Sequence, residues 1–448
     1  MSRSSAVLLL FTALLFTCTY SYTFQWNSPN GKGNVINPNF TYVEVNKVDK
    51  EAINLPYPGE FYTGYITVNQ TSGSKVFYQL YSAGGNKRAS TVNDTAPFIL
   101  SLAGGPGVPG GNSYYETGPF RVILTDDQFG PVLNDVTWND EYHLLYVDNP
   151  VGVGYSVMNN DMPDNAMDNG IYLMNFLERF FQLYPNLKKQ DFYLQGESYG
   201  GHFVLGLATQ LLNNPQLGIT FKGVGFQGGW YDPYWQSTAW GDGLFAVGVI
   251  DQKTQGLMND AAEQFRGNIS LGNYQNAYLL ADYIEDLMPK AIGAADYRND
   301  TPWDSATLIW LNLLTVKGYL AADPNTQWTS LDLRPYYHLD FPQSYAANVT
   351  HMLNNYDISF LFYGGQNDFK VTTAGTKHSL NHLGWTGIAG YLAAENKVWK
   401  DTDGYVIGQY KHYKKLTFAT INKAGHNSAH DQPWTVKNIV DKWVKNKW

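Results

Sequence analysis

The segment from Phe192 to Leu207 constrains the fold of this chain more than any other. It reads FYLQGESYGGHFVLGL. An aromatic and aliphatic run predicts a buried strand at 192–194, and an apolar run predicts a helix from His202 to Leu212. The pentapeptide GESYG at 196–200 lies between them and predicts a sharp, strained turn that presents a serine hydroxyl above a sheet. This pattern is typical of a nucleophile elbow and makes Ser198 a candidate nucleophile. The alternative is a serine that caps the following helix.

Strand and helix patterns alternate on both sides of this segment. We expect strands at 60–68, 75–81, 98–102, 142–148, 221–227, 358–363 and 416–421, and helices at 168–184 and 436–444. From Trp230 to about Tyr356 the chain is rich in Trp, Tyr and Asp and has a helical pattern. The order predicts an α/β fold with a mostly parallel central sheet, flanked by helices and carrying a helical lid insertion. The expected division is a core at 22–229 and 357–448 with an inserted lid at 230–356.

The first 21 residues predict a secretory signal peptide. Arg3 precedes a short apolar run from Ala6 to Cys18, and small and polar residues follow. We therefore expect the protein to enter the secretory pathway. No later stretch has the apolar length of a membrane span, so the mature chain is expected to be soluble. N-x-[ST] sequons fit this route and occur at Asn39, Asn69, Asn93, Asn268, Asn299 and Asn348.

Charge and cysteine content exclude several classes of function. The net charge of −9 and the lack of a Lys/Arg-rich tract argue against nucleic acid as a partner. The only cysteine, Cys18, lies inside the predicted signal. The mature chain should therefore contain no disulfide, no thiol nucleophile and no cysteine metal ligand.

A serine nucleophile needs a base to take its proton and an acid to orient that base. In α/β hydrolases the acid and then the histidine follow the serine, each in a loop after a core strand. Asp368 follows the predicted strand 358–363, and His426 follows 416–421, so these two residues are the expected partners of Ser198. His430, in the same loop as His426, is the alternative base.

Other histidines have simpler interpretations. His202 on the elbow helix is expected to be a hydrogen-bonded, partly buried residue. The pairs His378/His382 and His426/His430 have i,i+4 spacing but lack the Glu of an H-E-x-x-H motif, so we predict no metal site and no cofactor.

The glycine loop at 104–111 follows the predicted strand 98–102. Gly105, Gly107 and Gly110 match G-x-G-x-x-G, but prolines interrupt the motif and no helical pattern follows, which argues against dinucleotide binding. We expect instead a loop that directs backbone N–H groups at a reacting oxygen. Glu197, directly before Ser198, is tolerable there if a second carboxyl shares its proton. The alternative is an exposed acid on the turn.

Taken together, these segments resemble the serine carboxypeptidases, which have an α/β-hydrolase fold. The resemblance covers most of the mature chain, and the motifs occur in the family's order. They are FYTGYITVN, GGPG followed by ETGPF, TWNDEYHLLYVDNPVGVGYS, GESYGGHFV, the Y-x-G-x-x-D of Tyr363, Gly365 and Asp368, and AGH…DQP.

The resemblance implies a role for each matching residue. Ser198, His426 and Asp368 would be nucleophile, base and orienting acid, and the backbone N–H groups of Gly105 and Tyr199 would form the oxyanion hole. Glu197 and Glu116, with Gly104, would recognise the C-terminal carboxylate of a peptide at acidic pH. The implied partner is a peptide or protein C-terminus, and the implied location is secreted or lysosomal/vacuolar. The sequence leaves the oligomeric state open, a homodimer included.

Some positions depart from the family pattern. Ser101 and Ala103 replace the Trp and Asn of W-x-N-G-G-P-G, and that Asn normally donates to the substrate carboxylate. Asn112, Asn149 or Asn427 are candidate replacement donors, and Asn427 stands where the family has a Met. Two alternatives therefore remain open: a related hydrolase or acyltransferase with an altered substrate, and a non-catalytic, protective homologue.

Overall fold

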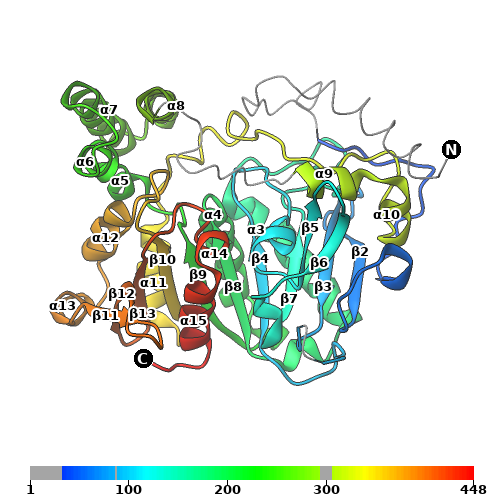
Figure 1. Ribbon diagram of the computed structural model, residues 1–448. Helices are drawn as coiled ribbons and strands as arrows, with labels where there is room; N and C mark the ends of the chain where they lie inside the picture. Colours follow the sequence, from blue (N-terminus) through cyan, green and yellow to red (C-terminus); the bar gives the residue numbers. More distant parts are fainter. Residues whose placement is uncertain (1–32, 86–87, 293–304) are drawn as a thin grey trace.

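An 11-stranded sheet forms the centre of the molecule (Figure 1). The structure is a computed structural model that describes residues 33–85, 88–292 and 305–448. The predicted signal peptide with Cys18 and the sequon at Asn299 lie outside the described residues. The strand order is β1-β2-β3-β7-β4-β8-β9-β10-β13-β12-β11. The run from β7 to β13 is parallel, and antiparallel strands flank it on both sides. This agrees with the predicted mostly parallel α/β sheet.

The strands of this sheet are β1 (Asn46–Lys47), β2 (Phe61–Thr67), β3 (Lys75–Tyr81), β4 (Phe98–Leu102), β7 (His143–Val147), β8 (Phe192–Glu197), β9 (Phe221–Gln227), β10 (Ser359–Gly365), β11 (Lys397–Lys400), β12 (Val406–Tyr413) and β13 (Leu416–Ile421). A separate antiparallel pair is formed by β5 (Phe120–Leu124) and β6 (Phe129–Leu133).

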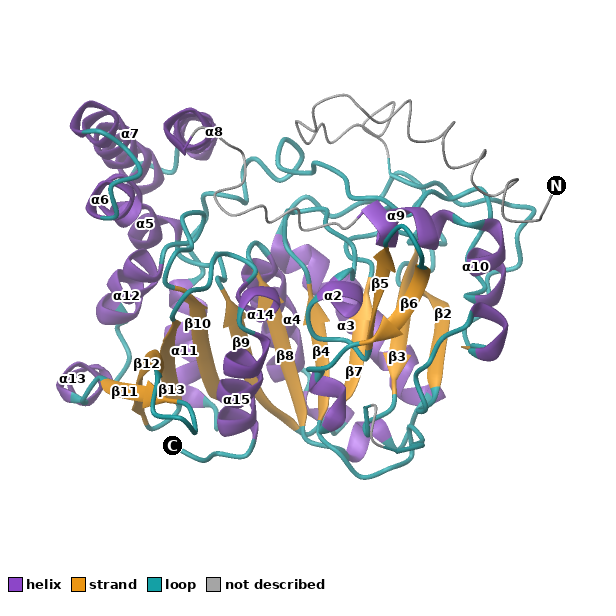
Figure 2. Ribbon diagram, viewed as in Figure 1, coloured by secondary structure: helices purple, strands orange, loops and turns teal. Residues whose placement is uncertain are grey.

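Helices cover both faces of the sheet (Figure 2). On one face lie α3 (Ala166–Leu183), α4 (Gly200–Asn213) and α11 (Ala346–Asn355), and on the other lies α15 (Pro433–Val444). Side chains alternate between the two cores along each strand, as the period of two requires. In β8, Phe192 and Leu194 join the core beneath α3 and α4, whereas Tyr193 packs with Trp443 of α15. Burial on both faces explains why the central strands are nearly continuous apolar runs.

The segment from 230 to 356 is largely helical and contributes no strand among its described residues. It contains α5 (Pro233–Gln236), α6 (Trp240–Ala246), α7 (Gln252–Ser270), α8 (Tyr274–Ile292), α9 (Ser305–Asn312), α10 (Leu314–Tyr319) and α11. In Figure 1, α6, α7 and α8 project beyond one end of the sheet, whereas α9 and α10 lie near its other end. The exact bounds of a lid stay a prediction. No helix in the described ranges is long and apolar enough to cross a membrane.

The other α-helices of the described residues belong to the core and its loops: α2 (Asn112–Tyr115), α12 (Thr373–His382), α13 (Ile388–Ala393) and α14 (Ser428–Asp431). The predicted strands at 75–81, 98–102, 221–227 and 416–421 coincide with β3, β4, β9 and β13. Not every apolar residue of the predicted helix 168–184 is buried. Ile171 is 45% exposed because it lies on the solvent side of α3.

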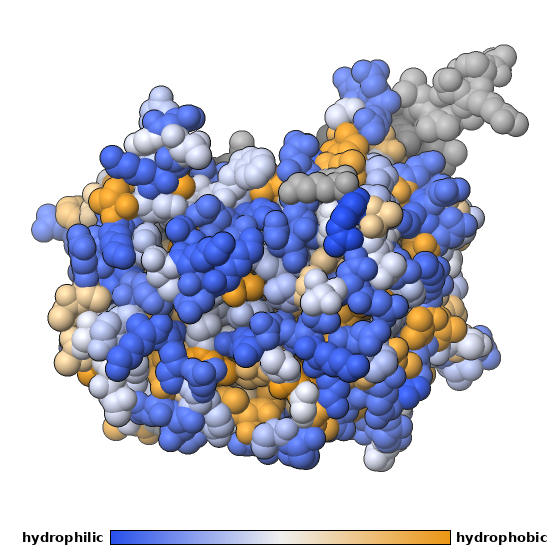
Figure 3. Space-filling view, turned by 90° about the horizontal axis from the view of Figure 1, so that it is seen from below, coloured by the Kyte–Doolittle hydropathy of each residue, from blue (hydrophilic) through white to orange (hydrophobic). Residues whose placement is uncertain are grey.

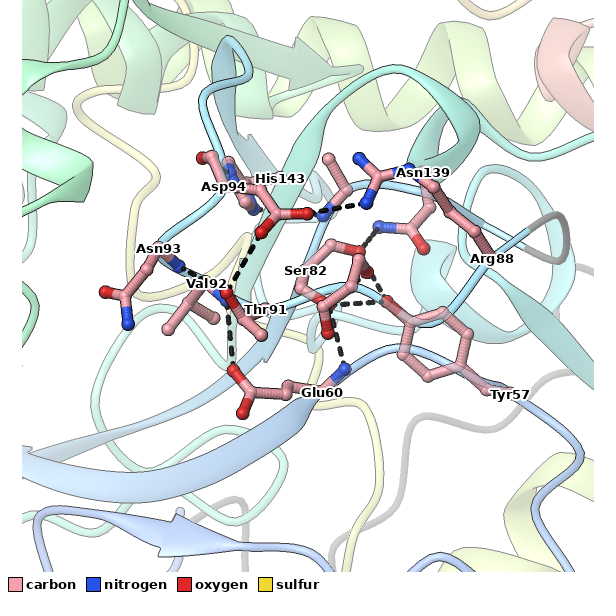
Figure 4. A network of polar contacts seen from close by, with 12 residues as sticks. Tyr57, Glu60, Ser82, Arg88, Thr91, Val92, Asn93, Asp94, Asn139 and His143 are labelled. Carbon is pink, nitrogen blue, oxygen red and sulfur yellow. Dashed lines mark hydrogen bonds and ion pairs between the residues drawn. The ribbon is translucent and has the colours of Figure 1, made fainter.

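A network of hydrogen bonds joins the loops at the N-terminal ends of β4 and β7 (Figure 4). The buried His143 accepts from the N–H of Ala83 at 2.9 Å through Nδ1, and its Nε2 lies 2.8 Å from the carbonyl oxygen of Asp94. This network lies at the edge of the sheet opposite the carboxyl ends of the parallel strands. Seen from below, the molecule is mostly hydrophilic, with apolar residues in small separate groups (Figure 3).

Candidate active site

Ser198 lies between β8 and α4, in the sharp turn that the sequence predicts. Its φ of +54° is in the left-handed region, which is unusual for a residue with a side chain and stores strain at the turn. A Cβ on Gly196 or Gly200 would lie within 2.5 Å of a backbone carbonyl oxygen, so the turn requires glycine on both sides. Tyr199 precedes the first residue of α4, and no side-chain hydrogen bond caps this helix, which argues against Ser198 as a helix cap.

Backbone hydrogen bonds hold the serine from both sides. Its N–H donates to the carbonyl oxygen of Gln227 in β9 at 3.1 Å, and its own carbonyl accepts from the N–H of Trp230 at 2.7 Å. The turn is therefore fixed by the strand next to it in the sheet.

Asp368 and His426 lie in loops after β10 and β13, at the same edge of the sheet. Nδ1 of His426 is 2.8 Å from Oδ2 of Asp368. The other carboxylate oxygen of Asp368 accepts from the N–H groups of Lys370 at 3.0 Å and Val371 at 2.9 Å. Asp368 is 2% exposed. Its carboxylate is thus fixed by backbone donors and presents one oxygen to the imidazole.

Gly228 places this pair next to the serine. A Cβ on Gly228 would lie 2.6 Å from Oδ2 of Asp368 and 3.3 Å from Nδ1 of His426. The preceding residue, Gln227, is the one that accepts from Ser198 N–H. Within the described ranges no hydrogen bond joins the Ser198 hydroxyl to His426, and in hydrolases without substrate this contact is often long and tightens on binding.

The glycine loop after β4 lies directly against the elbow. A Cβ on Gly104 would lie 2.7 Å from Cβ of Ser198 and 2.7 Å from the backbone nitrogen of Tyr199. Gly105 follows with a φ of +106°. In the part of the chain that the structure describes, the N–H groups of Gly105 and Tyr199 have no backbone or side-chain acceptor. Only the four-residue α2 follows the loop, which does not fit a dinucleotide fold.

Two buried carboxyl groups meet beside the serine, and one amide contacts both. Nδ2 of Asn427 lies 3.0 Å from Oε1 of Glu197 and 3.2 Å from Oε1 of Glu116. Glu197 is 7% exposed and Glu116 is 3% exposed. Glu197 is therefore not an exposed acid on the turn. Burial and the neighbouring Glu197 hold the pKa of Glu116 well above its ordinary value, so the pair retains a proton under acidic conditions.

The candidate replacement donors differ in position. Asn427 contacts the carboxyl pair, whereas Oδ1 of Asn149 accepts from Asn169 at 3.0 Å. The side chain of Asn112 lies outside the described part of the structure. Ala103 is buried and offers no side-chain donor.

Sequence reasoning missed Gln227 and the hydroxyl of Tyr363. Gln227 donates to Oε2 of Glu116 at 3.1 Å and accepts from the hydroxyl of Tyr363 at 3.0 Å. The only sequence signal was a polar residue at the end of a buried strand, at the sheet edge that carries Ser198.

The competing histidines make other contacts. Both ring nitrogens of the buried His202 face backbone carbonyl oxygens, at 2.7 Å and 3.1 Å. The His430 side chain is 54% exposed. Across the described ranges no group of three or more His, Cys, Asp or Glu residues could hold a metal ion. A separate open cavity of about 670 Å³ is lined by Trp235, Asn354 and His382, among others, and by none of the predicted site residues.

Comparison with known proteins agrees with the fold and the order of the motifs. The serine carboxypeptidase family model matches residues 52–446. A probable serine carboxypeptidase of Homo sapiens is 28% identical over 440 residues, covering 91% of this chain and 89% of the relative. A venom serine carboxypeptidase of Apis mellifera is 29% identical over 407 residues, covering 86% of this chain and 84% of the relative.

Among solved structures, the chain is similar to a prohormone-processing carboxypeptidase from Saccharomyces cerevisiae. The TM-score is 0.77 at 22% identity, and the match covers 90% of this chain and 96% of that one. This likeness shows a shared fold. With a family model that matches nearly the whole described chain, this protein belongs to the serine carboxypeptidase family.

Proposed function

We propose that this protein is a serine carboxypeptidase that releases C-terminal residues from peptides through an acyl-enzyme on Ser198. His426 takes the hydroxyl proton as the serine oxygen attacks the carbonyl carbon, then gives it to the leaving amine, and water releases the acyl group. Asp368 fixes the imidazole so that Nε2 is free to take the proton. The observation that carries the proposal is the 2.8 Å contact between His426 and Asp368. This pair packs against Gly228, and the preceding residue, Gln227, accepts the hydrogen bond from Ser198 N–H.

The oxyanion of the tetrahedral intermediate is assigned to the N–H groups of Gly105 and Tyr199. The close contact of the glycine loop with the elbow supports this assignment. Donors that are already oriented cost no reorganisation when negative charge develops in the transition state.

Recognition of the terminal carboxylate is assigned to Glu197 and Glu116, with Gly104 next to them. An anionic C-terminus binds beside two carboxyls only if at least one of them is neutral, which burial favours at acidic pH. As pH rises and the pair loses its proton, repulsion should weaken the binding of free-acid substrates. The proposed activity is therefore acid-favoured.

A second candidate is a hydrolase or acyltransferase that retains Ser198, Asp368 and His426 but has another substrate. The buried methyl group of Ala103 favours it, because the family uses an Asn there to contact the substrate carboxylate. A non-catalytic homologue would not react with a fluorophosphonate at Ser198.

We also assign the protein to the secretory pathway, with peptide or protein C-termini as its partners. The predicted signal peptide and the surface positions of Asn39 and Asn93 support this route.

The test is the release of C-terminal residues from blocked dipeptides at pH 4 to 8 by the wild type and Ser198→Ala. Acid-favoured release that is lost in the variant supports the proposal. A peptide amide that is cleaved as well as the free acid contradicts the exopeptidase assignment and favours the second candidate.

A further inference from the structure

Three buried polar side chains, from Glu197, Gln227 and Tyr363, lie on neighbouring strands near Glu116. Glu197 in β8 is in register with Gln227 in β9, which is in register with Tyr363 in β10. Because register neighbours share a face, all three side chains lie on the α15 side of the sheet. Gln195, two residues before Glu197, lies on the same face. Gln195, Gln227 and Tyr363 are each no more than 3% exposed.

The hydrogen bonds among these side chains run in one direction. Nε2 of Gln195 donates to the Tyr363 hydroxyl at 3.0 Å. The single proton of that hydroxyl is then donated to Oε1 of Gln227, also at 3.0 Å. An amide whose oxygen accepts from the phenol must direct its NH2 group the other way, and here it faces Glu116. Tyr363 thus sets the orientation of Gln227.

Both oxygens of Glu116 accept from amide N–H groups. Nε2 of Gln227 lies 3.1 Å from Oε2 and 3.4 Å from Oε1. Nδ2 of Asn427 lies 3.2 Å from Oε1 of Glu116 but also 3.0 Å from Oε1 of Glu197. A proton on Glu116 would compete with these donors, because an N–H and an O–H cannot share one lone pair. Since Asn427 contacts both carboxyls of the pair, Gln227 is the donor that favours the carboxylate form at Glu116.

The charged and titratable groups around Glu116 come from several elements. They are Glu197 from β8, His430 from α14, Tyr146 from β7 and Tyr363 from β10. Burial and Glu197 raise the pKa of Glu116, while Gln227 and Asn427 lower it. The pair as a whole therefore keeps one proton at acidic pH, and the direction of the hydrogen bonds decides which carboxyl carries it.

We propose that Gln227, oriented by Tyr363, is a positioning residue that holds Glu116 as the carboxylate and so places the proton of the pair on Glu197, next to Ser198. This inference rests on the proposed function, because the protonated Glu197 is the group that would donate to the substrate carboxylate.

The test is the pH dependence of kcat/KM for a free-acid peptide in Gln227→Met, which removes the donor to Glu116, and in Tyr363→Phe, which removes the hydroxyl that orients this donor. Loss of a donor to a carboxylate raises the pKa of the pair. The pH at which kcat/KM falls on the alkaline side should therefore rise by about one pH unit in Gln227→Met, and by less in Tyr363→Phe. Two variants keep the test valid if one of them fails to fold. Gln195→Met is the control, since Gln195 is equally buried but donates to Tyr363 and not to Glu116 among the described contacts. The pH profile of kcat/KM in this variant should match that of the wild type.

An independent measurement follows the titration of the glutamate carboxyls by ¹³C NMR, with Glu197→Gln for assignment. The pair should titrate at higher pH in Gln227→Met than in the wild type. The inference would be overturned if both the pH profile of kcat/KM and the NMR titration of the two variants matched those of the wild type. It would also be overturned if Gln195→Met shifted the pH profile as much as Gln227→Met does. If the NMR shift occurs but no C-terminal residue is released, the proposed function fails and the positioning role stands.

Discussion

The hydroxyl of Tyr199 donates a hydrogen bond to the buried carboxylate of Asp340. Tyr199 follows Ser198 in the chain, and Asp340 lies in the segment predicted to be a lid. The same carboxylate accepts from the hydroxyl of Tyr345 at 2.5 Å and from the N–H of Ala166 at 3.2 Å. Asp340 therefore couples the elbow to the inserted segment and to the start of α3.

This coupling predicts the effect of Tyr199→Phe. The variant removes one donor to a buried carboxylate and should lose about 1–3 kcal/mol of unfolding free energy, measured by urea denaturation. Tyr345→Phe is the matched control, with a similar loss of stability but no change at the elbow. Labelling of Ser198 by a fluorophosphonate should slow more in Tyr199→Phe than in Tyr345→Phe. Equal labelling rates would show that Asp340 supports stability alone.

Asp368→Asn should abolish most activity while keeping the fold. The Asn carbonyl would take the N–H groups of Lys370 and Val371, which leaves its NH2 group to face Nδ1 of His426. The imidazole would then carry its proton on Nε2 and could not accept the proton of Ser198. We expect kcat to fall by about 10⁴-fold, as for the equivalent change in a Ser-His-Asp protease.

The matched control for that experiment is Asp431→Asn. Asp431 accepts from the N–H of Gly425 at 2.6 Å in the histidine loop, and its other carboxylate oxygen lies 3.5 Å from Nδ1 of His430. Its kcat should stay within a few-fold of the wild type. A comparable loss in both variants would mean that the loop, not the tautomer of His426, limits the reaction.

Gly104→Ala should damage the site, whereas Gly256→Ala should stabilise the protein. A methyl group on Gly104 would meet the carbonyl oxygen of Glu197 at 2.6 Å and Cβ of Ser198 at 2.7 Å, so the loop must move away from the elbow. Overpacking of this kind costs about 1–3 kcal/mol. Gly256 lies in α7 with nothing within 4 Å of a Cβ, and alanine there should add about 0.5–1 kcal/mol. Urea denaturation and fluorophosphonate labelling separate the two outcomes.

How well each element could be predicted follows from its burial. β4 and β13 are largely apolar runs because both faces of the sheet are covered, and their bounds follow from the sequence. β11 and β12 lie at the exposed edge, where residues such as Val398 and Val406 alternate with polar side chains. Both strands are therefore absent from the sequence-based prediction, and so is the β5–β6 pair.

The candidate site divides in a similar way. Ser198, Asp368 and His426 could be placed from the order of the strands, because parallel strands bring their following loops to one edge of the sheet. Gln227 and Tyr363 could not, since their roles depend on the register between β9 and β10 and on a side chain from a distant loop. The bridging position of Asn427 likewise depends on tertiary packing.

Buried carboxyls predict that the protein is more stable at acidic than at alkaline pH. Burial raises the pKa of Asp148 from 3.8 to about 7, and the pKa of Glu116 is raised as well. For an acid with a raised pKa in the folded state, the stabilisation is complete below the unfolded pKa and is lost as pH rises through the folded pKa. The melting temperature should thus fall by a few degrees between pH 5 and pH 8.

Asp148→Asn tests the source of this dependence. One carboxylate oxygen of Asp148 accepts from the N–H of Gly110 at 2.9 Å, and the other accepts from the N–H of Tyr155 at 2.8 Å. In the variant, one of these two N–H groups would face the amide NH2 instead of an oxygen. The variant should be less stable at every pH, but its melting temperature should change less with pH. A wild-type melting temperature that rises from pH 5 to pH 8 would contradict the prediction.

Two of the sequons should differ in glycosylation when the protein is secreted from eukaryotic cells. The side chain of Asn93 is exposed and points away from the network in Figure 4, and its Nδ2 has no hydrogen-bond partner among the described residues. In contrast, Nδ2 of Asn69 donates to Asp161 at 3.0 Å and to the hydroxyl of Tyr172 at 2.9 Å. A sugar on that nitrogen would break both hydrogen bonds, so the folded protein should carry a glycan at Asn93 and none at Asn69.

Mass spectrometry of glycopeptides checks both positions. Asn93→Gln should lower the apparent mass of the secreted protein, whereas Asn69→Gln should leave that mass unchanged but reduce stability, because the bonds to Asp161 and Tyr172 are lost. Since Asn93 lies at the sheet edge opposite Ser198, removal of its glycan should not change peptide release. A glycan found on Asn69 in folded, secreted protein would show that these hydrogen bonds are dispensable and that the turn at 69–74 has another conformation.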